Sequence, residues 1–139
     1  MKVTIEMDSS ELMLTALRFN DRINQQDLEG LVELMTDDHT FVDNAGNVTK
    51  GKNIMKEHWR GFFKKCPDYR NEFTGVTVQD NVVVMVGYSV CSLKSLNGPN
   101  IWTAKIHDGR VSEWKVFWLN ESARESSLTQ DFLRVHSGS

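Results

Sequence analysis

The chain has 139 residues, and its 16 Lys and Arg against 19 Asp and Glu give a formal net charge of −3. A chain of this length fits one compact domain that buries about two-thirds of its unfolded surface. Apolar residues make up 40% and charged residues 25%, which is typical of a globular protein and excludes a disordered or membrane-spanning chain. No basic stripe is present for a phosphate backbone, so we expect neither nucleic acid nor a membrane as a partner.

The N-terminus and the cysteines indicate the compartment. The first six residues lack the apolar core of a signal peptide, and we therefore expect a cytoplasmic protein. Cys66 and Cys91 are expected as free, partly buried thiols, because two cysteines in a reducing cell rarely form a disulfide. Asp37 and His39 share one strand face, but two ligands do not make a metal site. We expect no metal and no other cofactor.

Helical spacing dominates the first half of the chain. Asp8-Ser9-Ser10-Glu11 has the form of a capping box, in which a side chain accepts from the first turn of a helix. Apolar periodicity and helix-breaking residues predict three helices before Pro67, over about 9–24, from Asp27 to Met35 and from Ile54 to Cys66. Two strands, 37–43 and 47–49, are predicted between the second and third helices.

The pattern after Pro67 is that of β-strands. The expected strands are 71–78, 82–93, 101–107 and 111–119, joined by turns at Asp80-Asn81, 97–100 and Asp108-Gly109. Alternation along the two strands of the last hairpin places Trp102, Trp114 and Trp118 on the same face of the sheet. Such an aromatic stripe is typical of a core, or it lines a cavity.

One stretch, 37–51, carries the main candidate for chemistry. The period of two in its strand puts His39, Phe41 and Asp43 on one face. An acid on an apolar face loses hydration unless it is paired or kept for chemistry. Asp43 is also the first residue of a turn-like sequence, in which Asp and Asn bond their own backbone. Both interpretations, catalytic and structural, stay open at this point.

The order of these elements, with the run 34–43, the connection 46–51 and the closing hairpin 108–114, resembles the nuclear transport factor 2-like superfamily. The resemblance is closest to its SnoaL-like and ketosteroid-isomerase-like branch, and covers about residues 9–120. It implies an α+β fold, a cone in which a strongly curved, mostly antiparallel sheet wraps three helices around a deep apolar pocket.

Residues 1–8 and 121–139 would then be an N-terminal extension and a C-terminal tail. The resemblance also implies a homodimer formed through the outer face of the sheet. By alternation, that face carries Glu113, Lys115 and Phe117.

The resemblance also implies roles for single residues. In the steroid isomerases of this superfamily the general base is an Asp at the end of the first strand, where Asp43 stands. Their two oxyanion donors correspond here to Phe19 and Trp102. Both of the original donors are therefore missing, and losing one typically costs ~10²–10³ in rate. We do not expect ketosteroid isomerisation, although Trp102 keeps an indole N–H that can donate.

The sequence thus predicts a protein with an apolar pocket for a hydrophobic small molecule, in which isomerase, cyclase or dehydratase chemistry would run through Asp43 as acid or base. Whether it is an enzyme stays open, because a non-enzymatic module that binds a ligand or dimerises fits the same residues. The predicted ligand-binding residues are aromatic or close to aromatic positions: Phe19, Phe41, His58, Trp59, Trp102, Trp114 and Trp118.

Overall fold

The computed structural model describes residues 8–43 and 45–118. Its elements, in chain order, are α1 (Ser9–Gln25), α2 (Leu28–Glu33), β1 (Met35–Val42), β2 (Val48–Lys50), α3 (Lys52–Lys65), β3 (Arg70–Gln79), β4 (Val82–Val90), the short 3₁₀ helix η1 (Lys94–Leu96), β5 (Gly98–His107) and β6 (Arg110–Trp118). Apart from Asp8, the predicted N-terminal extension and C-terminal tail lie outside the described residues. The division into extension, domain and tail stays a prediction.

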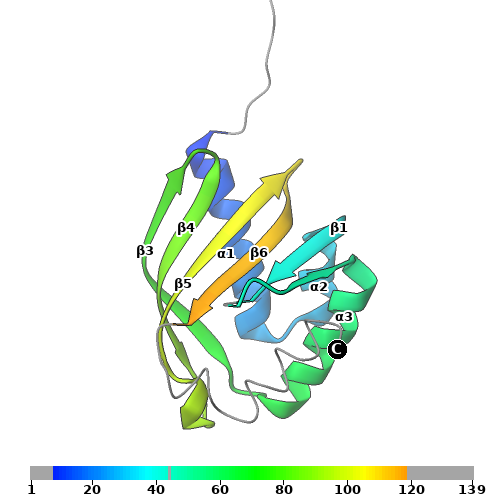
Figure 1. Cartoon of the computed structure of the whole chain (residues 1–139), viewed down its shortest axis with the longest axis vertical. Helices are drawn as coiled ribbons and strands as arrows, with labels where there is room; N and C mark the ends of the chain where they lie inside the picture. The colour runs from blue at the N-terminus through cyan, green and yellow to red at the C-terminus, as the bar shows by residue number, and fades with distance from the viewer. Residues whose placement is uncertain (1–7, 44, 119–139) are drawn as a thin grey trace, which may run out of the picture.

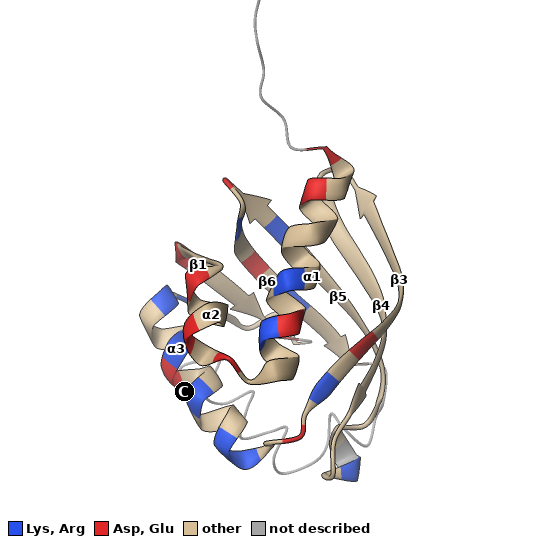
Figure 2. Ribbon diagram, turned by 180° about the vertical axis from the view of Figure 1, so that it is seen from behind, with Lys and Arg blue, Asp and Glu red and all other residues tan. Residues whose placement is uncertain are grey.

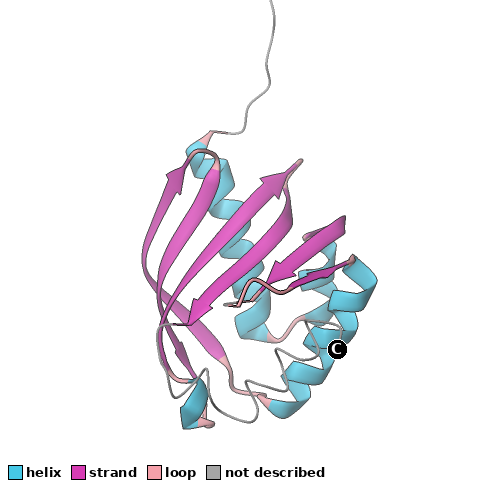
Figure 3. Ribbon diagram, viewed as in Figure 1, coloured by secondary structure: helices cyan, strands magenta, loops and turns pink. Residues whose placement is uncertain are grey.

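The strands form one sheet in the order β2-β1-β6-β5-β4-β3. All neighbours are antiparallel except β1 and β6, which run parallel. The sheet curves strongly, and α1 lies within the curve while α3 closes the side next to β1 and β2 (Figures 1 and 3). The predicted α+β cone with a mostly antiparallel sheet is confirmed.

Side-chain caps explain where the first two helices begin. The carboxylate of Asp8 accepts the backbone N–H of Glu11 at 3.0 Å, and that of Asp27 accepts the N–H of Gly30 at 3.0 Å. Each bond satisfies an N–H group that the first turn of a helix leaves without a partner. The second helix ends at Glu33 rather than Met35, because Met35 already pairs with Val111 in the sheet.

The three turns of the meander differ in how well the sequence predicted them. Two are tight turns as expected, with positive φ at Asp80 and Asn81 in one and at Asp108 and Gly109 in the other. The turn predicted over 97–100 is wrong, since β5 already begins at Gly98. The chain turns earlier, over 91–97, where η1 forms and the side chain of Asn97 accepts the N–H of Cys91 at 2.6 Å.

The pairing of β3 with β4 contains an irregularity that bends the sheet. The register shifts between Phe73 and Gly75, opposite Gly87. A side chain at Gly87 would collide with the backbone of Glu72 and Phe73, so the two strands approach this closely only because the position is glycine. The bend brings the start of β3 over the concave face, beside α1 (Figure 1).

The helices differ in charge: α1 carries residues of both signs, α2 carries only the acids Glu29 and Glu33, and α3 is mostly basic (Figure 2). Among the described helices, none combines the length and the apolar character that a membrane span requires. The concave face of the sheet, by contrast, is buried. Its core includes Trp102, Trp114 and Phe41, each with at most 2% of its surface exposed.

Candidate functional site

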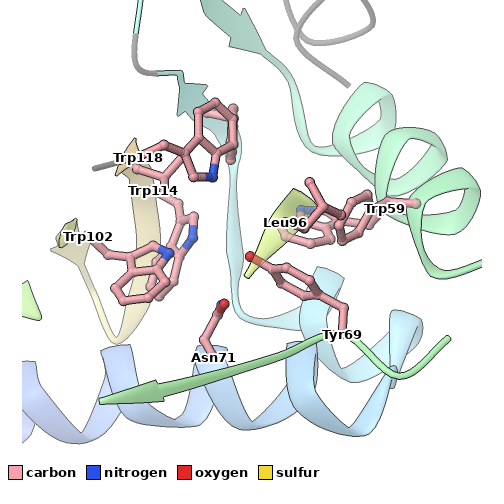
Figure 4. Close-up of a pocket in the computed structure, with 10 residues that line it drawn as sticks. Trp59, Tyr69, Asn71, Leu96, Trp102, Trp114 and Trp118 are labelled. Carbon is pink, nitrogen blue, oxygen red and sulfur yellow. The ribbon is translucent and has the colours of Figure 1, made fainter. Parts of the chain in front are cut away.

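A cavity lies at the end of the cone where β3 begins and β6 ends. Ten side chains line it: Phe41, Trp59, Phe62, Tyr69, Asn71, Leu96, Trp102, Trp114, Val116 and Trp118. They come from α3, η1, four strands and, for Tyr69, the connection between α3 and β3, so the curved sheet and the helix beside it together build the site (Figure 4).

The cavity is narrow. The volume in which a water molecule can be centred is only about 30 Å³. This is room for a few water molecules at most. Four of the lining residues, Phe62, Tyr69, Leu96 and Trp118, keep 7–8% of their surface exposed, so the cavity meets the surface beside them.

Three tryptophans form one wall. Figure 4 shows the indole nitrogens of Trp102, Trp114 and Trp118 on the ring edges that face the cavity. Tyr69 and Asn71 lie on the opposite side of the cavity. Within the described part of the chain, no hydrogen bond uses these three N–H groups. An indole N–H can donate but cannot accept, so the wall offers donors to an oxygen atom placed in the cavity.

A buried polar network forms the opposite side. Its centre is Ser89 in β4, whose hydroxyl lies 3.0 Å from the Tyr69 hydroxyl, 2.8 Å from Asn71 Oδ1 and 2.8 Å from Asn100 Nδ2. Asn71 in turn bonds Asn20 of α1, with Nδ2 and Oδ1 3.1 Å apart. Burial is the main cause that raises the pKa of Tyr69 to about 12, so its phenol stays protonated at neutral pH.

Asp43 follows the last residue of β1 and is fully buried, but it is not among the side chains that line the cavity. Its Oδ1 accepts the backbone N–H of Ala45 at 2.8 Å and of Asn47 at 3.0 Å, and its Oδ2 accepts Asn47 Nδ2 at 3.0 Å. These bonds satisfy the carboxylate within the turn between β1 and β2. The catalytic role of Asp43 stays a prediction.

Phe19 and His39 pack together in the core rather than in the cavity lining. The Phe19 ring lies 5.6 Å from the His39 ring and 4.7 Å from Trp114. His39 Nδ1 is 2.7 Å from the carbonyl oxygen of Val111, so Nδ1 carries the hydrogen. Desolvation in this apolar setting lowers the His39 pKa to about 4, which keeps the ring neutral.

The remaining sequence-predicted residues divide between the cavity and its surroundings. Phe41, Trp59, Trp102, Trp114 and Trp118 line the cavity. His58 on α3 is partly buried and does not line it, and burial lowers its pKa. The structure thus brings together the predicted aromatic residues of the sheet and α3.

A family model for the SnoaL-like domain matches residues 16–114. The chain belongs to the SnoaL-like family. Comparison with curated protein sequences found no significant match.

Solved structures agree with the fold of this SnoaL-like chain. A protein of Shewanella putrefaciens, provisionally described as a SnoaL-like polyketide cyclase, superposes with a TM-score of 0.71 at 13% identity, covering 94% of this chain and 99% of that one. One from Kribbella flavida, provisionally described as a ketosteroid isomerase, gives 0.66 at 17% identity over 80% and 79%. TerC, co-crystallised with polyporic acid, gives 0.65 at 16% identity over 78% and 91%.

Sequence reasoning missed the polar side of the cavity of this SnoaL-like domain. Tyr69, just before β3, and Asn71, its second residue, stand two positions apart, and this spacing indicates that they share a face. Their partners Asn20, Ser89 and Asn100 are single polar residues in other elements. No local pattern joins them, because only the curvature of the sheet brings them together.

Proposed function

We propose that this SnoaL-like protein binds a flat, largely apolar small molecule that carries a carbonyl oxygen, in the cavity between the tryptophan wall and Tyr69. The observation that carries the proposal is the group of three indole N–H donors of Trp102, Trp114 and Trp118, which face the cavity without a partner among the described residues. A carbonyl oxygen is an acceptor that would satisfy such donors.

The apolar lining supplies affinity and the donors supply orientation. Aromatic side chains offer large apolar area with a few directional polar atoms, which is the usual composition of a small-molecule site. Since the space now open is about 30 Å³, a ligand of two or more rings enters by moving side chains at the mouth. Leu96 in the short η1 and Trp118 at the end of β6 are the residues placed to move.

The comparisons support a ligand of this kind. One structure with the same fold was crystallised with a small organic molecule, polyporic acid, and another is provisionally described as a polyketide cyclase. Sequence identities of 16% and 13% support a shared fold but not a shared substrate. The proposed ligand class therefore rests on the side chains of the cavity.

A second candidate is acid/base catalysis on the bound molecule through Asp43. The residue lies two positions after Phe41, which lines the cavity. Donors on a carbonyl oxygen would stabilise an enolate as a proton leaves the neighbouring carbon. For Asp43 to take that proton, its carboxylate would have to leave the bonds from Ala45 and Asn47.

The binding proposal is tested with a matched pair of small ligands, 1-tetralone and tetralin, which differ in the carbonyl group. Titration calorimetry on the full chain should give tighter binding of 1-tetralone. Trp102→Phe and Trp114→Phe should each weaken it about fivefold, the value of one neutral hydrogen bond, and leave tetralin within about twofold. Absence of binding by both ligands, or equal affinity for the two, would overturn the proposal.

We also propose that two copies pair through the convex face of the sheet. That face exposes Val86, Tyr88 and Val90 of β4, each about 40% accessible, and Phe117 lies on the same side of β6. Light scattering at micromolar concentration should give twice the mass of one chain. The Val86→Lys variant should give the mass of a single chain. A single-chain mass for the unaltered protein would contradict the pairing.

A further inference from the structure

The hydrogen-bond network behind the cavity fixes the direction of every bond in it. Asn20 Nδ2 lies 3.2 Å from the backbone carbonyl oxygen of Asn71. A carbonyl oxygen can only accept, so this end of the Asn20 amide is its NH₂ group. The oxygen of Asn20 therefore faces the side chain of Asn71 at 3.1 Å, and Asn71 must donate to it.

The same reasoning continues to Tyr69. Because the Asn71 nitrogen faces Asn20, its oxygen faces Ser89 Oγ at 2.8 Å, and Ser89 must donate. A serine hydroxyl has one hydrogen. Ser89 Oγ can then only accept, from Asn100 Nδ2 at 2.8 Å and from the Tyr69 hydroxyl at 3.0 Å. Tyr69 therefore donates its single phenolic hydrogen to Ser89.

Water cannot easily reverse this order. Asn20, Asn71, Ser89 and Asn100 are 5%, 3%, 1% and 2% exposed, and they belong to four different elements. Reversing one bond requires reversing all of them, back to a backbone carbonyl that cannot donate. The Tyr69 oxygen faces the cavity (Figure 4) and interacts with the side chain of Asn71 as well as with Ser89, so it keeps one lone pair for a ligand but no hydrogen.

We propose that Tyr69 acts as a hydrogen-bond acceptor that selects ligands bearing a hydroxyl group on the side opposite their carbonyl. This inference rests on the proposed function and narrows its ligand class to hydroxylated aromatic ketones. The tryptophan wall donates to the carbonyl oxygen, and the ligand hydroxyl donates to Tyr69. A ligand with only acceptors would place one of them against the lone pair of Tyr69, which leaves a buried oxygen without a partner.

The ligand donor is a neutral hydroxyl rather than an ammonium group. Among the described residues that line the cavity, none is a carboxylate, so a buried cation would have no counter-charge. Tyr69 itself does not supply one, because its raised pKa of about 12 keeps the phenol neutral. Selection therefore depends on hydrogen-bond direction alone.

The test uses 1-tetralones with a hydroxyl group at carbon 5, 6 or 7, each compared with its methoxy ether and with unsubstituted 1-tetralone. A methoxy group keeps the oxygen but has no hydrogen to donate. For the full-length protein, calorimetry should give at least one hydroxytetralone about tenfold tighter than its ether. Tyr69→Phe should reduce that preference to about twofold or less, because the acceptor is gone. Tyr88→Phe, the same change on the convex face of the sheet and outside the cavity lining, removes a bond to Glu72 and should leave the preference unchanged.

Each outcome decides between the two proposals. If no tetralone binds, the proposed function fails and this inference fails with it. If tetralones bind but every ether equals its phenol, the acceptor role of Tyr69 is contradicted while the binding site stands. The same holds if Tyr69→Phe keeps the full preference for the hydroxyl group. Should Tyr69→Phe fail to fold, the unaltered protein still decides, because a hydroxytetralone must then bind tighter than both its bulkier ether and the smaller unsubstituted 1-tetralone.

Discussion

Two buried polar regions of this protein use hydrogen bonds in opposite ways. At the end of β1, the charged Asp43 accepts three bonds, and all of them come from its own turn. Beneath the cavity, the neutral residues around Ser89 bond one another across α1, β3, β4 and β5. The first region is satisfied locally, whereas the second leaves a lone pair of Tyr69 facing the cavity.

The difference shows which polar groups can bond a ligand without a rearrangement of the protein. A carboxylate that is buried in a turn and does not line the cavity has to be repositioned before it can act on a substrate. Neutral groups whose directions are fixed by a network can present a lone pair or an N–H without any rearrangement. The residue that is most conspicuous in the sequence is therefore not the one that the fold leaves ready to bind.

Asn71→Ala should produce the largest effect, because it removes the link between α1 and Ser89. The buried oxygen of Asn20 and the hydroxyl of Ser89 would each lose a partner. A buried unsatisfied group costs about 1–3 kcal/mol, so the free energy of unfolding in urea should fall by about 4 kcal/mol.

Asn53→Ala provides the matched control for that loss. Asn53 is exposed on α3, where alanine favours a helix, and its free energy of unfolding should change by less than about 0.5 kcal/mol. If Asn71→Ala were as mild as this control, the network would not hold α1 to the sheet.

Acid should destabilise the protein through His39, which shares β1 with the Asp43 turn. Its pKa is about 4 in the fold against 6.5 for an ordinary histidine, so between these values the unfolded chain binds a proton that the folded chain does not. The contribution of the neutral His39 to the free energy of unfolding is present above pH 6.5 and is lost as the pH falls toward 4. At about 1.4 kcal/mol per pKa unit, the loss reaches about 3 kcal/mol.

His39→Gln separates this effect from the titration of carboxylates. Glutamine does not titrate, so urea unfolding of the variant between pH 7 and pH 5.5 should show a flatter pH dependence than the natural protein. Asp38, the neighbouring charge that favours the protonated ring, stays in place in both proteins. Equal slopes would contradict the buried neutral His39.

The fold could be predicted from the sequence because its signals are local. Asp8 and Asp27 mark helix starts, and Asp108-Gly109 marks a hairpin, each through contacts within a few residues. The turn misplaced at 97–100 shows the limit of such signals. Gly98-Pro99 is typical of a turn, yet pairing with Ser89 and Tyr88 draws both residues into β5.

The aromatic half of the cavity was accessible to the same reasoning, since alternation alone places Trp102 and Trp114 on the concave face. The polar half was not. Tyr69, Ser89 and Asn100 become neighbours through the bend of β3 over the sheet, and no spacing in the chain encodes that bend. Burial of single polar residues depends on tertiary contacts, which sequence patterns do not contain.

Asp43→Asn should have the smallest effect of the three changes, and it decides what the carboxylate is for. The amide oxygen of asparagine can keep the bonds from the backbone N–H groups of Ala45 and Asn47. Its nitrogen would face Asn47, which is exposed and can turn its amide so that the oxygen accepts this bond. All three bonds can be kept but none is charge-assisted any longer, and urea unfolding at pH 7 should show a loss of about 1–2 kcal/mol.

The matched control is Asp108→Asn, the same substitution in an exposed turn. Asp108 has a φ of 50°, a conformation that asparagine adopts readily, and the change in stability should stay within about 0.5 kcal/mol. An acid kept for proton transfer in an apolar setting behaves differently, because replacing it by a neutral residue relieves the cost of burying its charge. A loss at position 43 with none at position 108 therefore assigns Asp43 to the turn. An Asp43→Asn protein as stable as the natural one, or more stable, would instead restore Asp43 as the candidate base.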